Sequence, residues 1–167
     1  EDLFIKADVP TKQTETPLKI AATYDYTDEE GKELFQVVRL EPKSFRQRHK
    51  NGSGGWQWNL DGVRRVLYNL PSVKICDWIY LVEGEKDADA ITRLGYCGTT
   101  SPGGAQNWRN GYATSLSGKH ICIIPDKDGP GMEYARQVAL SVQSTAASVA
   151  VIILPGEQVK DLSDWLS

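Results

Sequence analysis

Residues 78–85, which read WIYLVEGE, and residues 121–129, which read ICIIPDKDG, decide the fold. Each is a short apolar run that ends in carboxylates: Glu83 follows the first, and Asp126 and Asp128 follow the second. Such runs are typical of buried strands, and the carboxyl ends of parallel strands meet at one edge of a sheet, where α/β proteins bind ligands. Carboxylates gathered there repel one another unless a hard cation neutralises them, and oxygen ligands suit Mg²⁺ or Mn²⁺. We therefore predict a metal-dependent site for phosphoryl transfer at this edge.

The residues around these two runs alternate between strand and helix patterns. Gly95 lies where the C-terminus of a helix favours glycine, and residues 101–104 predict a tight loop. Alternation of this kind indicates an α/β fold with a Rossmann-like, mostly parallel sheet flanked by helices. The expected elements are strands at 78–82, 96–100, 120–124 and 148–154, and helices at 86–94, around 105–115 and at 131–143.

The residues before this region follow another pattern. Residues 1–18 are polar, contain two prolines and read as a linker or extended lead-in. Apolar runs at 20–26 and 34–40, with turn residues between them, predict a β-hairpin. We predict a polar, basic loop at 42–55, a short strand at 56–60 and a short helix or strand at 63–70. The chain then divides into a lead-in (1–18), a small β-rich α+β subdomain (19–75) and an α/β domain (76–167).

Charge is unevenly distributed along the chain. The net charge is −3, but between Arg39 and Arg65 seven basic residues stand against two acidic ones, so this stretch carries +5. Cations alternate there with aromatic rings, which suits single-stranded nucleic acid, because arginines follow phosphates while rings stack on bases. A structural role is the alternative, since basic side chains are mostly solvated and tryptophans on a strand can face a core. The candidate nucleic-acid ligands are Arg46, Arg48, Lys50, Trp56, Trp58, Arg64 and Arg65.

Composition narrows the class of protein. The chain has 167 residues, 40% hydrophobic and 25% charged, which is typical of a soluble globular protein, and no apolar run is long enough to span a membrane. Cys76, Cys97 and Cys122 are odd in number and form no C-x-x-C pair. They predict reduced thiols, a cytoplasmic location and no zinc in this fragment. The first residues are neither an initiator methionine nor a signal peptide, which favours a fragment or a processed product.

The two motifs, in this order and spacing, resemble the TOPRIM domain, the catalytic module shared by bacterial (DnaG-type) DNA primases, topoisomerases and some nucleases. The TOPRIM pattern has a glutamate after one strand and an aspartate-x-aspartate after a later one, here Glu83, Asp126 and Asp128. The loop at 101–105, the segment 125–131 and the acidic tail with Asp161 and Asp164 are similar to the primase–helicases of phages and plasmids. The resemblance covers residues 78–166, about half of the chain.

This resemblance implies a site and an activity. Glu83, Asp126 and Asp128 are the implied catalytic residues and metal ligands, with Asp161 and Asp164 as further metal ligands. Lys86, Gly103 and Gly104 are the implied nucleotide or phosphate ligands. The implied enzyme is a DNA primase core that uses two Mg²⁺ or Mn²⁺ ions to join ribonucleoside triphosphates on single-stranded DNA.

Two alternatives stay open at this stage. A TOPRIM nuclease would cut phosphodiesters with the same metals, and a non-catalytic module of a replicative helicase would only bind DNA. Primases of this kind usually carry a zinc-binding domain and often a helicase domain, and this sequence contains neither. We therefore expect either an excised core or a related protein without these parts, with a helicase as a possible partner.

Overall fold

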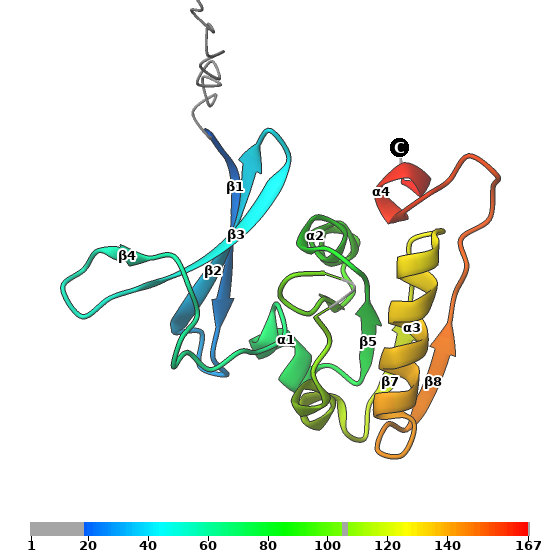
Figure 1. Ribbon diagram of the computed structural model, residues 1–167. Helices are drawn as coiled ribbons and strands as arrows, with labels where there is room; N and C mark the ends of the chain where they lie inside the picture. Colours follow the sequence, from blue (N-terminus) through cyan, green and yellow to red (C-terminus); the bar gives the residue numbers. More distant parts are fainter. Residues whose placement is uncertain (1–18, 105–106, 167) are drawn as a thin grey trace, which may run out of the picture.

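An antiparallel sheet and a parallel sheet lie side by side in this protein (Figure 1). The structure is a computed structural model that describes residues 19–104 and 107–166. Within these residues the antiparallel sheet has the order β1-β2-β3-β4 and the parallel sheet the order β6-β5-β7-β8. The predicted mixed α/β fold with a parallel sheet is thereby confirmed, while the predicted lead-in at 1–18 lies outside the described residues.

The antiparallel sheet is built on the predicted hairpin. β1 (Lys19–Thr27) pairs with β2 (Glu33–Glu41). In the turn between them, the Asp28 carboxylate accepts hydrogen bonds from the N–H groups of Glu30 and Lys32 at 3.2 and 2.8 Å. Because an aspartate can bond the backbone of its own turn in this way, the chain reverses here without losing hydrogen bonds.

Residues 44–50 of the basic segment form a strand, so the prediction of a loop at 42–55 is wrong for them, whereas residues 51–55 form a turn. β3 (Ser44–Lys50) pairs along β2, and β4, its own partner, is only Trp56–Gln57. A strand can carry several long basic side chains, because their aliphatic stems cover apolar surface while their charged ends stay in water. Alternation along β3 sends Phe45 and Arg46 to opposite faces of the sheet.

The parallel sheet has four short strands. β5 (Trp78–Leu81) lies between β6 (Gly98–Thr99) and β7 (His120–Ile123), and β8 (Ser148–Val151) forms one edge. The predicted strand at 148–154 is shorter because β7 ends at Ile123 and offers β8 no further ladder.

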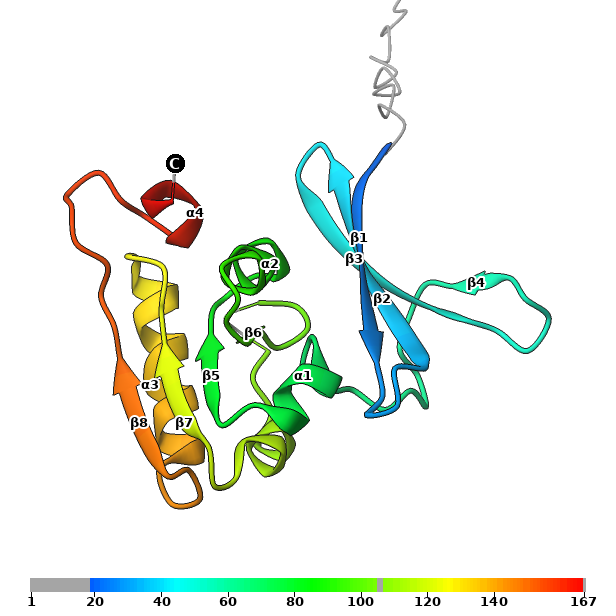
Figure 2. The same cartoon turned by 180° about the vertical axis from the view of Figure 1, so that it is seen from behind.

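Helices connect these strands and cover them. α2 (Glu85–Arg93) joins β5 to β6, and α3 (Gly129–Val142) joins β7 to β8. α3 lies in front of β7 and β8 in Figure 1 and behind them in Figure 2, so it covers one face only. The shorter helical elements are α1 (Leu70–Ile75), the 3₁₀ segment η1 (Asn110–Leu116) and α4 (Leu162–Trp165).

Two helical predictions need correction. Residues 63–69 form neither helix nor strand, and α1 starts only at Leu70. Pro71 lies in the first turn of α1, where the N–H that proline lacks would have no partner within the helix. The helix predicted around 105–115 is the 3₁₀ segment η1, and residues 105–106 lie outside the described residues.

One hydrophobic core runs through both sheets. Tyr26 and Phe35 of the antiparallel sheet belong to the same buried cluster as Ile79, Leu81 and Ile123 of the parallel sheet. The Tyr26 and Phe35 rings stack with centroids 4.5 Å apart. Since each fully buried side chain of this size contributes about 1.5–3 kcal/mol, this core fixes the two sheets against each other.

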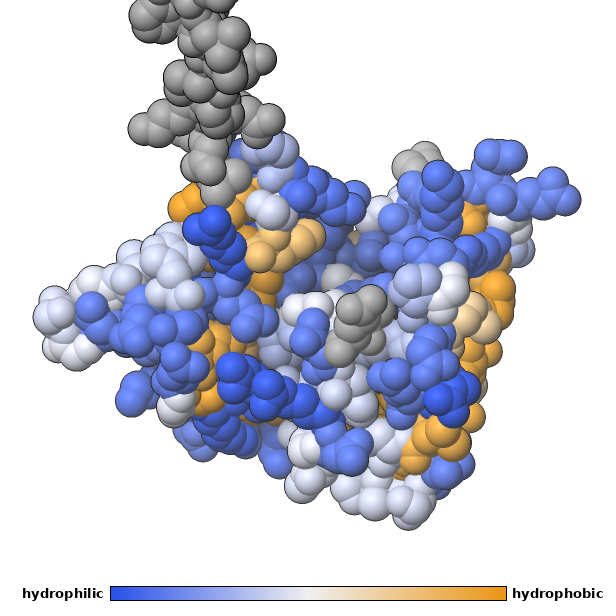
Figure 3. All heavy atoms as spheres, in the orientation of Figure 1, coloured by the Kyte–Doolittle hydropathy of each residue, from blue (hydrophilic) through white to orange (hydrophobic). Residues whose placement is uncertain are grey.

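The surface is mostly polar, with hydrophobic side chains exposed in more than one place, among them Phe45 on β3 and Ile75 at the end of α1. In Figure 3, hydrophobic atoms gather along the side where β8 runs, and there Val151, Ile152 and Ile153 are exposed. Among the described residues, no helix combines the length and the apolar character needed to cross a bilayer.

Candidate active site

A cavity of about 430 Å³ opens between the antiparallel sheet and the carboxyl ends of β5 and β7. It collects six of the residues predicted for catalysis, metal or phosphate, but neither Asp128 nor Asp164 lines it. Its walls are Tyr24, Val37, Arg39, Lys43, Phe45, Glu83, Gly84, Glu85, Lys86, Asp87, Gly103, Gly104, Asp126, Asp161 and Ser163.

Glu83 and Asp126 are held together by the backbone at the start of α3. Oε1 of Glu83 accepts a hydrogen bond from the N–H of Asp126 at 3.2 Å. Gly131 leaves the space for this contact, since a Cβ built there would lie 2.2 Å from the same Oε1 and 2.4 Å from the Asp126 carbonyl oxygen. A glycine is therefore required at this position, and the two carboxylates are brought together as predicted.

The other aspartates cap helices. Oδ1 of Asp128 accepts from the N–H of Gly131 at 2.8 Å and caps α3, and Oδ1 of Asp161 accepts from the N–H of Asp164 at 2.7 Å and caps α4. Oδ2 of Asp164 accepts from the N–H of Lys160 at 3.1 Å. Each cap leaves further carboxylate lone pairs, so capping and metal ligation are compatible at Asp128 and Asp161.

Burial and crowding of carboxylates, in that order, set the electrostatics of the cavity. Burial, and after it the neighbouring charges of Glu83, Asp87, Asp161 and Asp128, raises the pKa of Asp126 to about 7. Burial likewise raises the pKa of Glu83. Among the described residues, no three acidic, histidine or cysteine side chains already form a metal-ligand cluster. The oxygens nevertheless match the preference of Mg²⁺ or Mn²⁺, and their mutual repulsion is what a bound cation would relieve.

Glu85 and Asp87 stand on the first turn of α2, where acidic side chains also complement the helix dipole. Glu85 is buried, and its Oε1 accepts a hydrogen bond from the Tyr26 hydroxyl at 2.7 Å. Asp87 accepts one from the Ser163 hydroxyl, which ties α4 to α2. Both carboxylates therefore have structural partners that the sequence pattern does not reveal.

Cations line the same cavity, two of them on the side of the antiparallel sheet. Arg39 comes from β2 and Lys43 from the turn after it, while Lys86 comes from the start of α2. Arg39 and Lys43 are absent from the predicted site, although both belong to the basic stretch. Arg39 shares the cavity with its partner across the strands, Phe45, and the pairing of β2 with β3 was not predicted.

Most of the predicted nucleic-acid ligands gather on the other face of the antiparallel sheet. The Arg48 guanidinium lies 3.9 Å from the ring centroid of Trp56 and 5.1 Å from that of Trp58, and Lys50 lies 5.7 Å from Trp56. Arg48 also donates to Gln36 at 2.8 Å, on the face opposite Val37 and the cavity. By alternation Arg46 shares this face, so these five residues form one cation–aromatic patch that turns away from the cavity.

Arg64 and Arg65 lie elsewhere. Arg64 forms a two-bond ion pair with Glu29 of the hairpin turn, at 2.7 and 2.8 Å. Arg65 is half-buried and lies near Tyr112 of η1. Burial raises the pKa of the Tyr112 hydroxyl, and the charge of Arg65 partly offsets that rise. The structure therefore does not bring these two arginines to the patch.

The sequence alone finds no relatives: no family model matches this chain, and no curated protein matches it. Solved structures do match. The primase fragment of the bacteriophage T7 primase-helicase superposes with a TM-score of 0.64 at 20% identity, covering 85% of this chain and 55% of that one. The fold is that of DNA primase domains.

Two bacterial structures give the same result. The zinc-binding and RNA polymerase domains of the Aquifex aeolicus primase superpose with a TM-score of 0.65 at 17% identity, covering 86% of this chain and 36% of that one. A DNA primase domain from Pseudomonas aeruginosa gives 0.61 at 19% identity, covering 86% and 45%. This chain thus spans about half, or less, of the length of these three neighbours, and at such identities the likeness establishes the fold.

Proposed function

We propose that this chain is the TOPRIM-type catalytic core of a DNA primase, which joins ribonucleotides on a single-stranded DNA template. The observation that carries the proposal is the cavity in which Glu83, Asp126 and Asp161 face Arg39 and Lys43. Metal-binding acids on one wall and phosphate-binding cations on the other are the two groups that nucleotidyl transfer to a triphosphate requires. The primase fold of the chain supports the same reading.

The carboxylates of Glu83, Asp126 and Asp128 would hold the divalent ions, with Asp161 as a further ligand. Bound Mg²⁺ or Mn²⁺ would lower the pKa of the attacking 3′-hydroxyl and neutralise charge on the leaving pyrophosphate. The protein itself would position the ligand oxygens. Gly131 keeps the Glu83 carboxylate beside the Asp126 backbone, so the ligand oxygens are oriented before substrate arrives.

The cationic wall would hold the triphosphate. Arg39 and Lys43 reach the cavity from the antiparallel sheet and Lys86 from α2, so a triphosphate between them would lie against both sheets. Gly103 and Gly104, with φ of +90° and +73°, line the same cavity, and beside Gly104 the space that a Cβ would take is open, which would let a nucleotide approach its backbone. The cation–aromatic patch on the far face would guide the single strand outside the reaction site.

Primer synthesis tests the proposal directly. The protein is incubated with Mg²⁺ or Mn²⁺, labelled ribonucleoside triphosphates and single-stranded DNA, and the products are separated on a denaturing gel. New short RNA is the expected result. Shortened template would instead support a TOPRIM nuclease, and intact template with DNA binding alone would support a non-catalytic module of a helicase.

A pair of glycine variants links the activity to the geometry of the cavity. Gly131→Ala places a methyl group within 2.2 Å of Glu83 Oε1 and should abolish synthesis, whereas at Gly129 a Cβ has no atom within 4 Å. Gly129→Ala, in the same turn of α3, is therefore the matched control and should keep wild-type activity. Equal activity of the two variants would remove the Glu83–Asp126 arrangement from the mechanism.

A further inference from the structure

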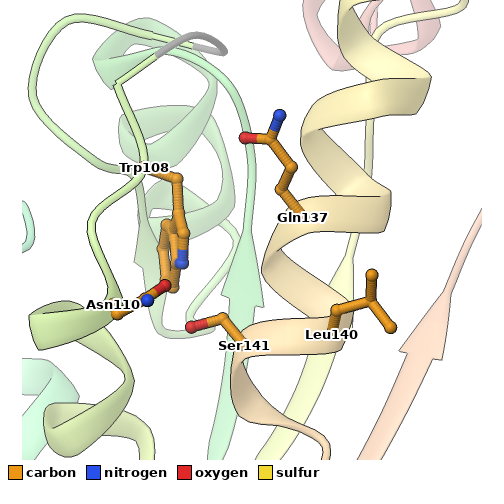
Figure 4. A pocket seen from close by; sticks show the side chains of 5 residues that line it. All are labelled: Trp108, Asn110, Gln137, Leu140 and Ser141. Carbon is orange, nitrogen blue, oxygen red and sulfur yellow. The ribbon is translucent and has the colours of Figure 1, made fainter.

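A second cavity, of about 590 Å³, lies between the segment that leads into η1 and the middle of α3 (Figure 4). It shares no lining residue with the candidate active site, and none of its lining residues carries a charge. They are Trp108, Asn110, Gln137, Leu140 and Ser141.

Unsatisfied polar atoms concentrate around this cavity. Among the described residues, three buried side-chain atoms have no hydrogen-bond partner: Nε1 of Trp108, Oγ of Ser141 and the hydroxyl of Tyr112. Two of the three belong to lining residues, and the Tyr112 ring packs against Trp108 with centroids 5.5 Å apart. Because buried donors and acceptors in folded proteins are nearly always paired, their gathering at one place points to a polar ligand.

The cavity has a flat aromatic wall. The Trp108 ring is held by edge contacts with Tyr112 and with Tyr134, whose centroid lies 6.2 Å away. In Figure 4 the indole is seen close to edge-on, Gln137 stands across the gap from it on α3, and the Ser141 side chain lies below the ring. A planar ligand can therefore enter between the indole and the helix.

We propose that this cavity binds a nucleobase. A neutral heteroaromatic ring would stack on the indole of Trp108, since aromatic side chains accept the π-face of any base. The amides of Asn110 and Gln137 offer the paired donor and acceptor with which carboxamides read base edges. The uncharged lining suits a neutral base, and the phosphates of a nucleotide bound in this way would lie outside the cavity.

Indole resonances test this proposal without any assay of primer synthesis. The chain has five tryptophans, so ¹⁵N labelling gives a small set of indole N–H signals, and Trp108→Phe identifies the one of interest. Adenosine, guanosine, cytidine and uridine are titrated separately to about 10 mM, a range that detects millimolar binding. The Trp108 signal should shift and saturate with at least one nucleoside and stay in place with ribose.

Two variants on α3 make the result specific. The exposed side chain of Gln137 donates a hydrogen bond to Glu133 on its own helix, so Gln137→Ala should keep the fold. The variant should weaken nucleoside binding at least about fivefold, as the loss of one hydrogen bond does. Gln143→Ala, at the end of α3 and outside the cavity, is the control and should leave the affinity unchanged.

The site is independent of the candidate active site, so Asp126→Asn protein should give the same titration. A Trp108 signal that stays in place, or that drifts with the other indole signals without saturating, would overturn the proposal. Unchanged affinity in Gln137→Ala would remove the base-reading role of the amides. None of these outcomes bears on primer synthesis, so the two proposals fail separately.

Discussion

Replacing Asp126 by asparagine should stabilise the metal-free protein above neutral pH. The substitution keeps the size of the side chain but removes the carboxylate whose pKa burial and the neighbouring acids, Glu83 foremost, raise to about 7. An unfolded aspartate ionises near its ordinary pKa of 3.8. Between these two values the folded state binds the extra proton, so stability is lost as pH rises through that window.

The size of the effect follows from the shift in pKa. A shift from 3.8 to about 7 is about three units, and at 1.36 kcal/mol per unit a fully desolvated carboxyl would lose about 4 kcal/mol. Because Asp126 is only half-buried, screening by solvent reduces this to about 2 kcal/mol. For a chain of this length that corresponds to a rise in Tm of about 4–8 °C in the variant.

Thermal unfolding in EDTA measures this difference. Wild-type and Asp126→Asn proteins are compared at about pH 4, where the two should unfold at nearly the same temperature, and at about pH 8, where the variant should lead. Asp61→Asn, in an exposed loop, is the control and should follow wild type. A variant that is no more stable than wild type at the higher pH would refute the raised pKa of Asp126, and with it the unfavourable burial of this carboxylate beside other acids.

Three further perturbations test the fold and the patch. Gly98→Ala would push a Cβ to 2.2 Å from the carbonyl of Ala88 and should cost about 3 kcal/mol in urea unfolding, whereas Gly111→Ala, with no atom within 4 Å, should be nearly neutral. Tyr26→Phe removes the hydroxyl that bonds a buried carboxylate of α2 and should cost about 2 kcal/mol, so a loss below about 0.5 kcal/mol would contradict that bond. Trp58→Ala should weaken single-stranded DNA binding by about 1–3 kcal/mol in fluorescence anisotropy, and unchanged binding would exclude that ring from the DNA path.

The periodicity of apolar residues and the acids at the ends of the apolar runs were enough to predict much of the fold and the positions of the acids. The apolar runs before Glu83 and Asp126 predict parallel strands, and the structure has β5 and β7 there, side by side. Helix signals also held, because Gly95 lies just past α2 with φ of +87°, a conformation that glycine adopts without strain. These features depend on residues close in the chain, and local sequence is therefore sufficient to predict them.

Other features could be seen only in the folded molecule. The strand character of β3 depends on the free edge of β2, and that pairing separates Arg39 from the cation–aromatic patch by turning them to opposite faces. The same packing pairs Tyr26 with Glu85 across fifty-nine positions of the chain. Such contacts join distant segments, and no local pattern encodes which face a charged side chain will take.

The sequence by itself thus determined which acids end two neighbouring strands, because strand length and polarity are local properties. Only the tertiary structure decided what faces them: cations from the antiparallel sheet, rather than the arginines and tryptophans that the sequence pattern favoured. The physical reason is that side chains alternate between the two faces of a strand. Which residues point to which face depends on the face that is buried against the core.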